Sequence, residues 1–202
     1  MRPRVIVLTS FGGFPGAPVN PTEAIAMLAA RRCAGRLQRL GIRLAHVHLP
    51  VDFARIKTEI AALFATHRPQ AVLHLGLAAR RKTLTPELQA LNRISLRYPD
   101  ASGAHATRGL IAPGAPDFLT ATAPALRLVH ILQGCGIDAR VSRNAGAYVC
   151  NQTLYLSLLA ARGGHRACRV GFIHLPQPSS RLTLRRMSDG VVACLIAMAR
   201  PC

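Results

Sequence analysis

The alternation of two kinds of apolar segment constrains the fold of this chain most. Short runs rich in β-branched residues alternate with longer segments that have helical periodicity. The predicted elements of the first half are strand 5–8, helix 21–40, strand 42–49, helix 53–67 and strand 71–75. This order is typical of parallel strands joined by helices that cover both faces of a sheet. We therefore predict an α/β fold, a three-layer α/β/α sandwich with a mostly parallel (mixed) central sheet.

The second half repeats this order, and nothing in the composition divides the chain. Its predicted elements are helix 125–133, a strand near 139–142, a helix that opens at Cys150 and ends at Gly163-Gly164, strand 169–174 and helix 187–200. The chain has 202 residues, of which 50% are hydrophobic, and it contains no Ser/Gly-rich linker. A chain of this size can bury one sizeable core, so residues 1–202 are predicted to form a single domain.

A glycine-rich loop follows the first predicted strand. Asn20-Pro21-Thr22-Glu23 is a favourable helix start, because Asn can cap a helix and Pro suits its first position. The loop 11–16 before it should therefore lie at the carboxyl end of the sheet, where open α/β folds bind ligands. It lacks the glycine spacing and the lysine of phosphate-binding loops. Phe11 and Phe14 either form an apolar wall for a ligand or plug the end of the sheet.

One cysteine and one histidine suggest nucleophilic chemistry. The small-residue turn in Asn144–Asn151 delivers Cys150 to the first turn of a helix, and an apolar strand ends by presenting His174. The pKa of a free thiol is about 8.5 and falls toward about 3.5 to 7.5 at a helix N-terminus or beside a protonated histidine. We therefore expect Cys150 to favour the thiolate. The alternative is that the cysteine is buried and inert and that the histidine is structural.

A cysteine–histidine pair usually needs a third group that orients the imidazole. The chain has only eight acidic residues. Two of them, Glu87 and Asp100, follow the predicted strand 71–75 near the carboxyl edge of the sheet. The spacing does not choose between them.

Taken together, these residues resemble the pyroglutamyl peptidase I family, cysteine peptidases that remove N-terminal pyroglutamate. The first shared stretch is Thr9–Gly16, followed by Asn20–Thr22, which is similar to the family's Thr-Gly-Phe-x-Pro-Phe-Gly-Gly loop and Asn-Pro-Ser. The nucleophile motif Ala-Gly-x-Phe/Tyr-Val-Cys-Asn is matched by Ala145–Asn151. The motif Gly-Phe-Ile-His-x-Pro is matched by Gly171–Pro176. The resemblance runs nearly end to end, and the last two motifs are specific.

The resemblance implies a role for further residues. A gapless match over 76–92 places the family's glutamate at Glu87, which would complete a triad with Cys150 and His174. The family's oxyanion-binding arginine falls on Arg97, which would act with the backbone N–H of Cys150. By analogy with the family's apolar pocket, the residues that would contact the lactam ring of the substrate are Phe11, Phe14, Tyr148 and Val149. The implied substrate is a peptide with N-terminal pyroglutamate, and no cofactor or metal is implied.

Departures from the family pattern fall at the substrate end. Leu77 replaces a glutamine, Ala79-Arg80 replace a Gly-Gly pair, Leu88 replaces an arginine, and Gln177 stands where an aromatic residue is common. An alternative hypothesis is therefore a family member that has altered N-acyl specificity or has lost the activity. Arg80 could narrow the cleft or attract an acidic substrate.

A third hypothesis, a basic nucleic-acid-binding module, comes from the net charge of +18. Of the 26 basic residues, all but Lys57 and Lys82 are Arg, so 24 are Arg, which is typical of a GC-rich coding sequence. With three Tyr and no Trp, few side chains could stack on bases. Nucleic acid is thus not expected to bind beyond non-specific charge attraction.

The location and the remaining partners are also predicted. Six cysteines are irregularly spaced without Cys-x-x-Cys, which argues against zinc and for a reducing cytoplasm. No apolar run is long enough to span a bilayer, so no membrane is expected. Members of the family commonly self-associate, so the resemblance implies a homo-oligomer.

Overall fold

Four long parallel strands and one short antiparallel strand form the central sheet. A computed structural model describes residues 4–163 and 168–200. The strand order is β2-β1-β3-β7-β4, so the last strand in sequence lies between two that precede it by many residues. The strands are β1 (Arg4–Phe11), β2 (Ile42–Leu49), β3 (Ala71–Leu77), β4 (Thr85–Pro86) and β7 (Arg169–Leu175). β4 alone runs antiparallel to its neighbour, which confirms the predicted mixed sheet.

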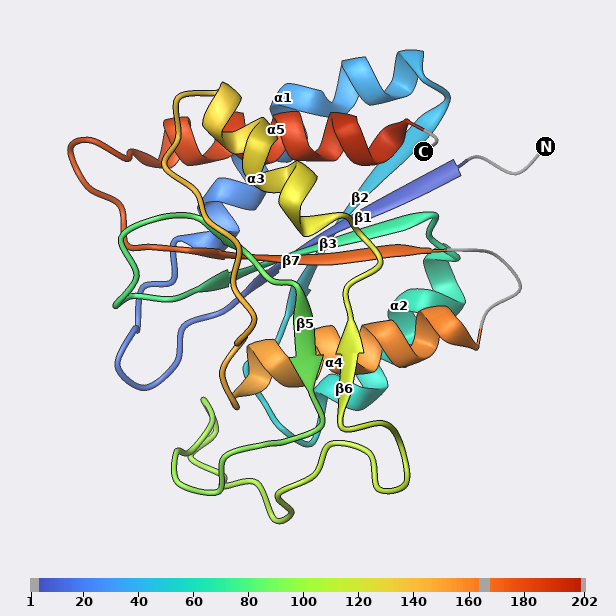
Figure 1. Cartoon of the computed structure of the whole chain (residues 1–202), viewed down its shortest axis with the longest axis vertical. Coiled ribbons are helices and arrows are strands. Elements are labelled where there is room, and N and C mark those ends of the chain that lie inside the picture. The colour runs from blue at the N-terminus through green and yellow to red at the C-terminus, as the bar shows by residue number, and fades with distance from the viewer. Residues whose placement is uncertain (1–3, 164–167, 201–202) are drawn as a thin grey trace.

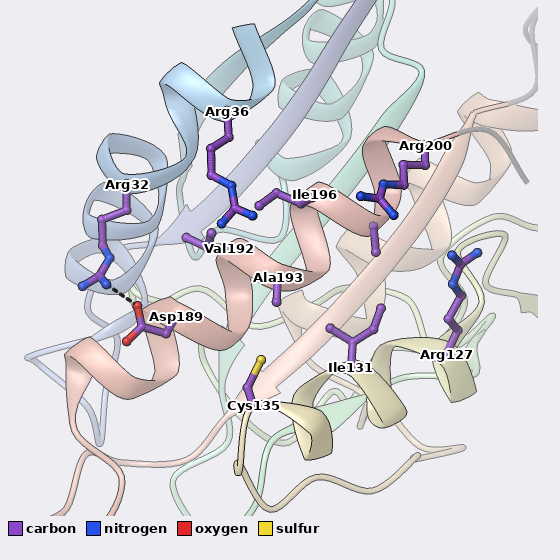
Figure 2. Close-up of a pocket in the computed structure, with 11 residues that line it drawn as sticks. Arg32, Arg36, Arg127, Ile131, Cys135, Asp189, Val192, Ala193, Ile196 and Arg200 are labelled. Atoms are coloured by element: carbon purple, nitrogen blue, oxygen red, sulfur yellow. Dashed lines mark ion pairs between the residues drawn. The ribbon is translucent and has the colours of Figure 1, made fainter. Parts of the chain in front are cut away.

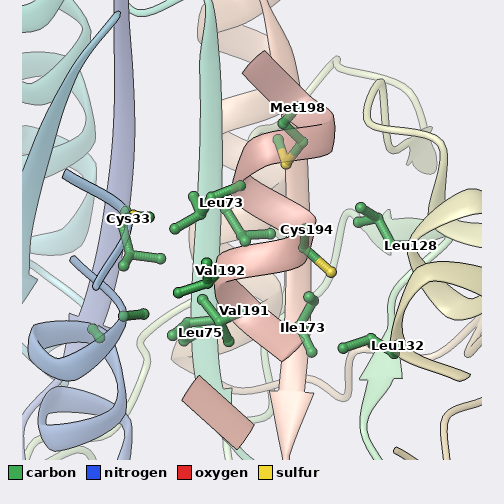
Figure 3. Close-up of a cluster of buried hydrophobic side chains, with 14 of the residues drawn as sticks. Cys33, Leu73, Leu75, Leu128, Leu132, Ile173, Val191, Val192, Cys194 and Met198 are labelled. Carbon is green, nitrogen blue, oxygen red and sulfur yellow. The ribbon is translucent and has the colours of Figure 1, made fainter. Parts of the chain in front are cut away.

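Helices cover both faces of this sheet (Figure 1). One face carries α1 (Thr22–Arg39), α3 (Ala125–Gly134) and α5 (Leu184–Ala199), and the other carries α2 (Ile56–His67) and α4 (Val149–Arg162). Each face has its own buried apolar cluster. In Figure 3, Leu73 and Leu75 of β3 pack against Val191 of α5. Burial on both faces explains why the central strands are mostly apolar, and every residue of β3 is buried. His74, the polar exception in β3, contacts Thr9 at 2.8 Å and Ser157 at 3.0 Å.

A small second sheet lies over α4. It pairs β5 (Gln89–Leu91) with β6 (Phe118–Thr120), and a long irregular segment joins the two strands (Figure 1). Asn151, which follows the candidate nucleophile on α4, binds this second sheet through two hydrogen bonds to Leu91. Asn151 Nδ2 donates to the Leu91 carbonyl at 2.8 Å, and Asn151 Oδ1 accepts from the Leu91 amide at 2.9 Å. The nucleophile helix and the second sheet are therefore held together at the site. In the described part of the chain, no helix combines the length and the apolar character needed to cross a membrane.

The predicted strand near 139–142 is wrong. The backbone hydrogen bonds of this segment to residues 84–88 form the isolated bridges of Ala139 with Leu84 and of Ser142 with Glu87, and they do not form a strand. Pro86 lies between these bridges and has no amide hydrogen to donate, so a continuous ladder cannot form there. The short strands β4, β5 and β6 carry no periodicity that a sequence pattern could reveal.

Two helices begin a few residues away from their predicted bounds. α5 begins at Leu184, three residues early, because Thr183 Oγ1 accepts the amide of Arg186 at 3.2 Å. α2 begins at Ile56 rather than at residue 53. The turn before it is closed by Asp52, whose Oδ1 accepts the amides of Ala54 and Arg55, each at 2.9 Å. Gly163 follows the last residue of α4, and Gly164 lies outside the described residues.

Candidate active site

The candidate nucleophile and base meet at the carboxyl ends of β3 and β7. Gly76 of β3 is the register partner of His174 of β7, and paired strands lie roughly 4.8 Å apart. Cys150 lies in the first turn of α4, which covers this face of the sheet. A Cβ atom built on Gly76 would lie 2.9 Å from Cys150 Sγ, so the thiol rests against the glycine backbone. The fold thus brings Cys150 next to the strand position beside His174.

Glu87 is the acid that contacts His174. Its Oε1 lies 2.7 Å from His174 Nδ1, and its side chain is completely buried. The backbone amide of Glu87 donates to the Phe172 carbonyl at 2.9 Å, which fixes the carboxylate beside β7. Asp100, the other candidate, instead accepts the backbone amide of Phe53 at 2.9 Å and shapes its own turn. The geometry therefore favours the glutamate that the family resemblance selects.

Arg81 is a member of this cluster to which the sequence analysis assigned no role. Its Nη1 donates to Glu87 Oε1 at 2.6 Å, the same oxygen that contacts the histidine. Its Nη2 donates to the Asn144 carbonyl at 2.8 Å, in the turn that leads to the nucleophile. A buried carboxylate needs a nearby cation, and this requirement was the signal that could have revealed Arg81. The arginine connects the acid to the loop before Cys150.

The electrostatics of the acid and the base follow from burial and from these contacts. Burial raises the pKa of Glu87, but its hydrogen bond to His174 and the charges of His174 and Arg81 outweigh that effect, so the pKa lies below its ordinary value. Burial lowers the pKa of His174, and although Glu87 opposes this, the net direction is down. A carboxylate can only accept, so His174 Nδ1 carries the proton and Nε2 is left to exchange protons with substrate.

The surroundings of Cys150 oppose the expected thiolate. Burial raises the pKa of its thiol to about 12, and the negative charge of Glu87 acts in the same direction. A backbone hydrogen bond and the charge of Arg81 lower the pKa, but they do not outweigh burial. Both directions favour a neutral thiol and a neutral imidazole in the resting site. The base must accept the thiol proton as the nucleophile attacks.

A small cavity adjoins the thiol and collects the predicted substrate-contacting residues. Its volume is about 30 Å³, enough for a water molecule and far below that of usual ligand pockets. The cavity is lined by Phe11, Phe14, Asn20, Val51, Leu77, Tyr148, Val149 and Cys150. The rings of Phe14 and Tyr148 lie 5.9 Å apart, and Tyr148 Oη donates to the Pro99 carbonyl at 2.8 Å. All four residues predicted to hold a lactam thus gather beside the candidate nucleophile.

Arg97 lies on the long segment between β5 and β6. Its side chain is exposed, and its guanidinium carbon lies 5.5 Å from the centre of the Tyr98 ring. No hydrogen bond joins this guanidinium to a residue that the structure describes. Its role as an oxyanion donor stays a prediction.

The family model for pyroglutamyl peptidase matches residues 4–194, nearly the whole chain. The chain belongs to the pyroglutamyl peptidase family. A pyrrolidone-carboxylate peptidase of Gloeobacter violaceus is 38% identical over 172 residues, which cover 85% of this chain and 80% of that protein. Another from Pseudomonas fluorescens is 35% identical over 205 residues, covering 96% of this chain and 92% of that protein.

Solved structures of pyroglutamyl peptidases share the fold. The pyroglutamyl peptidase I of Bacillus amyloliquefaciens superposes with a TM-score of 0.85 at 26% identity, covering 97% of each chain. The pyrrolidone carboxyl peptidase of Thermus thermophilus gives 0.81 at 33% identity, covering 94% of this chain and 98% of that one. The α/β architecture is therefore that of the family.

Of the departures from the pyroglutamyl peptidase pattern, only Leu77 lines the cavity. Ala79 and Arg80 are exposed at the turn that follows β3, and Gln177 is exposed beyond β7. Arg80 does not line the cavity in this conformation. A change of substrate recognition therefore rests mainly on one leucine.

The contact of Gly76 with the thiol predicts the effect of adding a methyl group there. A Cβ atom at Gly76 would lie 2.5 Å from Phe172 Cζ and 2.9 Å from Cys150 Sγ. Gly76→Ala is expected to lower the free energy of unfolding by about 1 to 3 kcal/mol. It should also lower kcat/KM roughly 100-fold, because the nucleophile is displaced. Urea unfolding and steady-state kinetics measure both effects.

Gly109→Ala is the matched control, because a Cβ atom there meets no atom within 4 Å. Wild-type activity of Gly76→Ala would contradict the close contact.

The charge of Arg81 predicts a shift in the pH dependence of activity. His174 must be neutral to act as a base, so activity falls as pH drops through its pKa, which burial holds below 6.5. Arg81 lowers that pKa and Glu87 raises it. Arg81→Met should therefore move the acidic limb of the kcat/KM profile to higher pH and lower its plateau. Arg81→Lys keeps the charge, and its limb should stay nearer that of the wild type. If the acidic limb of the kcat/KM profile of Arg81→Met lies at the same pH as in the wild type, the electrostatic role of Arg81 is rejected and only a structural role is left.

Proposed function

We propose that this protein is a cysteine-type omega-peptidase that removes N-terminal pyroglutamate (5-oxoproline) from peptides. The observation that carries the proposal is the set of contacts at the sheet edge. Cys150 lies against Gly76, beside His174, whose imidazole is held by the buried carboxylate of Glu87. The family to which the chain belongs supports the same reaction.

The first half of the proposed reaction makes an acyl-enzyme. His174 Nε2 accepts the thiol proton as Cys150 Sγ bonds to the carbonyl carbon between pyroglutamate and the next residue. The carbonyl π electrons move to oxygen, where the backbone N–H of Cys150 and the side chain of Arg97 are proposed to stabilise the charge. The imidazolium stays paired with ionised Glu87. When the oxyanion collapses, the C–N bond breaks and His174 gives its proton to the departing amine.

The second half returns the site to its resting state. Water attacks the thioester carbon while His174 accepts a proton from it, and the C–S bond then breaks. The sulfur regains its proton from the imidazolium, and free pyroglutamate leaves. Neither half needs a metal or a redox cofactor for its balance of protons and electrons.

The substrate pocket must widen before it can hold a lactam. The cavity of about 30 Å³ beside Cys150 is bordered by Phe14 on the loop after β1 and by Tyr148 just before α4. A displacement of the Phe14 ring away from Tyr148 would enlarge it without breaking a helix or a strand. Aromatic and aliphatic walls suit the flat, uncharged ring.

Because Leu77 replaces the family's glutamine, we expect the cavity to fit the lactam ring of pyroglutamate incompletely. Leu77→Gln places an amide in the cavity wall, where it can hydrogen-bond to the ring of pyroglutamate. We expect KM for a pyroglutamyl amide to fall about fivefold, the equivalent of about 1 kcal/mol. Arg80→Gly, which restores a family residue outside the cavity, should leave KM unchanged. A KM that does not fall in Leu77→Gln would show that residue 77 does not contact the lactam.

Release of a fluorogenic amine from its pyroglutamyl amide tests the proposed activity directly. The wild type should release the amine, and no release at high enzyme concentration would reject the proposal. The second candidate function, an altered N-acyl specificity, is favoured by Leu77 in the cavity wall. Turnover of prolyl or N-acetyl amides in place of the pyroglutamyl amide would support that alternative.

The cellular location and the oligomeric state complete the proposal. Five described cysteines, including Cys150, are free thiols, which supports a reducing compartment such as the cytoplasm. Whether copies of the chain associate is measured by sedimentation velocity, and the family resemblance supports a homo-oligomer.

A further inference from the structure

A second and larger cavity lies on the opposite face of the sheet, far from the thiol. It is a groove of about 560 Å³ over the outer side of α5, between α1 and α3 (Figure 2). Its volume is within the range of small-molecule sites, whereas the cavity beside Cys150 is not. The proposed peptidase reaction does not use it.

The floor of the groove is aliphatic. Val192, Ala193, Ile196 and Ala197 of α5 form it, and Ile131 of α3 borders it. The three residues 193, 196 and 197 are partly exposed, although the neighbouring positions on the same helix are buried in the core. From residue 192 to residue 199, α5 rises roughly 10 Å at about 1.5 Å per residue. The groove therefore offers an extended apolar track with no aromatic ring.

The rim of the groove is strongly positive. Arg32 and Arg36 of α1, Arg127 of α3 and Arg200 after α5 line it, with Asp189 as the one acidic residue (Figure 2). Asp189 is neutralised by Arg32, whose Nη2 lies 2.6 Å from its Oδ1. The remaining three guanidinium groups have no acidic partner within the part of the chain that the structure describes. The rim thus carries about three uncompensated positive charges.

We propose that this groove binds an aliphatic carboxylate, with its chain on the α5 floor and its head group against the unpaired arginines. Guanidinium groups bind carboxylates through paired, charge-assisted hydrogen bonds. An alkyl chain would cover the apolar floor of the groove. A nucleic acid is a poorer occupant, because its polar sugar–phosphate backbone would leave this floor in contact with water. A second copy that docked through the same face is a poor occupant, because its own arginine rim would lie against this one.

Calorimetric titration of the full-length protein with decanoate tests this proposal. Decanoate is expected to bind in a one-to-one ratio with a dissociation constant of roughly 1 mM or below. Decan-1-ol has the same chain without the charge and should bind at least roughly tenfold more weakly. Equal affinity for the two, or no binding of decanoate, would overturn the proposal.

Arginine variants locate the head group. Arg36→Gln and Arg127→Gln should each weaken decanoate binding roughly tenfold. Arg31→Gln is the matched control, because Arg31 is exposed on the same helix as Arg36 but does not line the groove. Equal losses in all three variants would indicate only a general effect of net charge and would reject a built site.

Ala193→Trp fills the floor and should abolish decanoate binding while circular dichroism stays unchanged. If this variant instead lowers the sedimenting mass and decanoate does not bind to the wild type, the groove holds a second copy and the proposal fails. If an acidic helical peptide binds and decanoate does not, the occupant is a protein and the proposal fails as well. Pyroglutamyl amide turnover should be unaffected by the arginine variants.

Discussion

Cys150→Ala is expected to lower the rate of pyroglutamyl amide hydrolysis by about 10⁴-fold or more, the loss typical when a catalytic nucleophile is removed. Its thiol rests on the Gly76 backbone at the start of α4, where it alone can form the acyl-enzyme. Alanine removes the sulfur and adds no bulk, so the fold should persist. Single-turnover release of the fluorescent amine, followed at high enzyme concentration, measures the loss.

Cys168→Ala is the matched control. Cys168 is a free and buried thiol that lies outside the site, so its removal should leave turnover near the wild-type level. Mass spectrometry of the intact protein with a slowly hydrolysed pyroglutamyl ester should detect an acyl adduct in the wild type and none in Cys150→Ala. Equal turnover by Cys150→Ala and the wild type would rule out this cysteine as the nucleophile.

Glu87→Gln is expected to lower kcat by about 10³- to 10⁴-fold, the scale seen when the acid of a triad is neutralised. The carboxylate accepts from His174 Nδ1 at 2.7 Å and from Arg81 at 2.6 Å in a fully buried position. An amide cannot stabilise the imidazolium, and it leaves the arginine charge without a partner. The tautomer of the histidine is also no longer fixed, because the amide can donate as well as accept.

The variant should lose stability as well as activity. Breaking a buried ion pair by neutralising one partner costs about 3 to 5 kcal/mol, and the partial exposure of Arg81 reduces this cost. Urea unfolding separates the two effects, and kinetics should be measured where the variant is folded. Glu59→Gln, which removes a partly exposed carboxylate paired with Arg55 on the surface of α2, should leave activity unchanged and alter stability little. Activity within tenfold of the wild type in Glu87→Gln would reject the triad.

Much of the fold was predictable because buried parallel strands and amphipathic helices leave strong periodic patterns. Strands β1, β2, β3 and β7 were found this way. The segment 139–142 was not, because the choice between a strand and isolated bridges depends on Pro86 of the neighbouring chain segment. Tertiary pairing of this kind is absent from local sequence.

The candidate site was partly predictable for a different reason. Cys150 and His174 stand at element ends that motifs identify, whereas Glu87 needed the family resemblance. Arg81 was missed because its role depends on how deeply Glu87 is buried. The direction of the Cys150 pKa was missed for a similar reason, because the position of the residue in its helix was visible in the sequence, whereas the desolvation of its thiol was not.

The position of β7 in the sheet has a consequence for how the molecule is made. β7 enters between β3 and β4, which lie in the first half of the sequence, so it forms contacts of long sequence separation. Closing such loops is slow, and it follows the synthesis of most of the chain. Until β7 pairs with it, β3 is an open edge of the sheet, although all of its residues are buried in the folded protein. Such an edge is a template for aggregation. A nascent or truncated chain that ends before β7 therefore lacks His174 and leaves the β3 edge of the sheet unpaired.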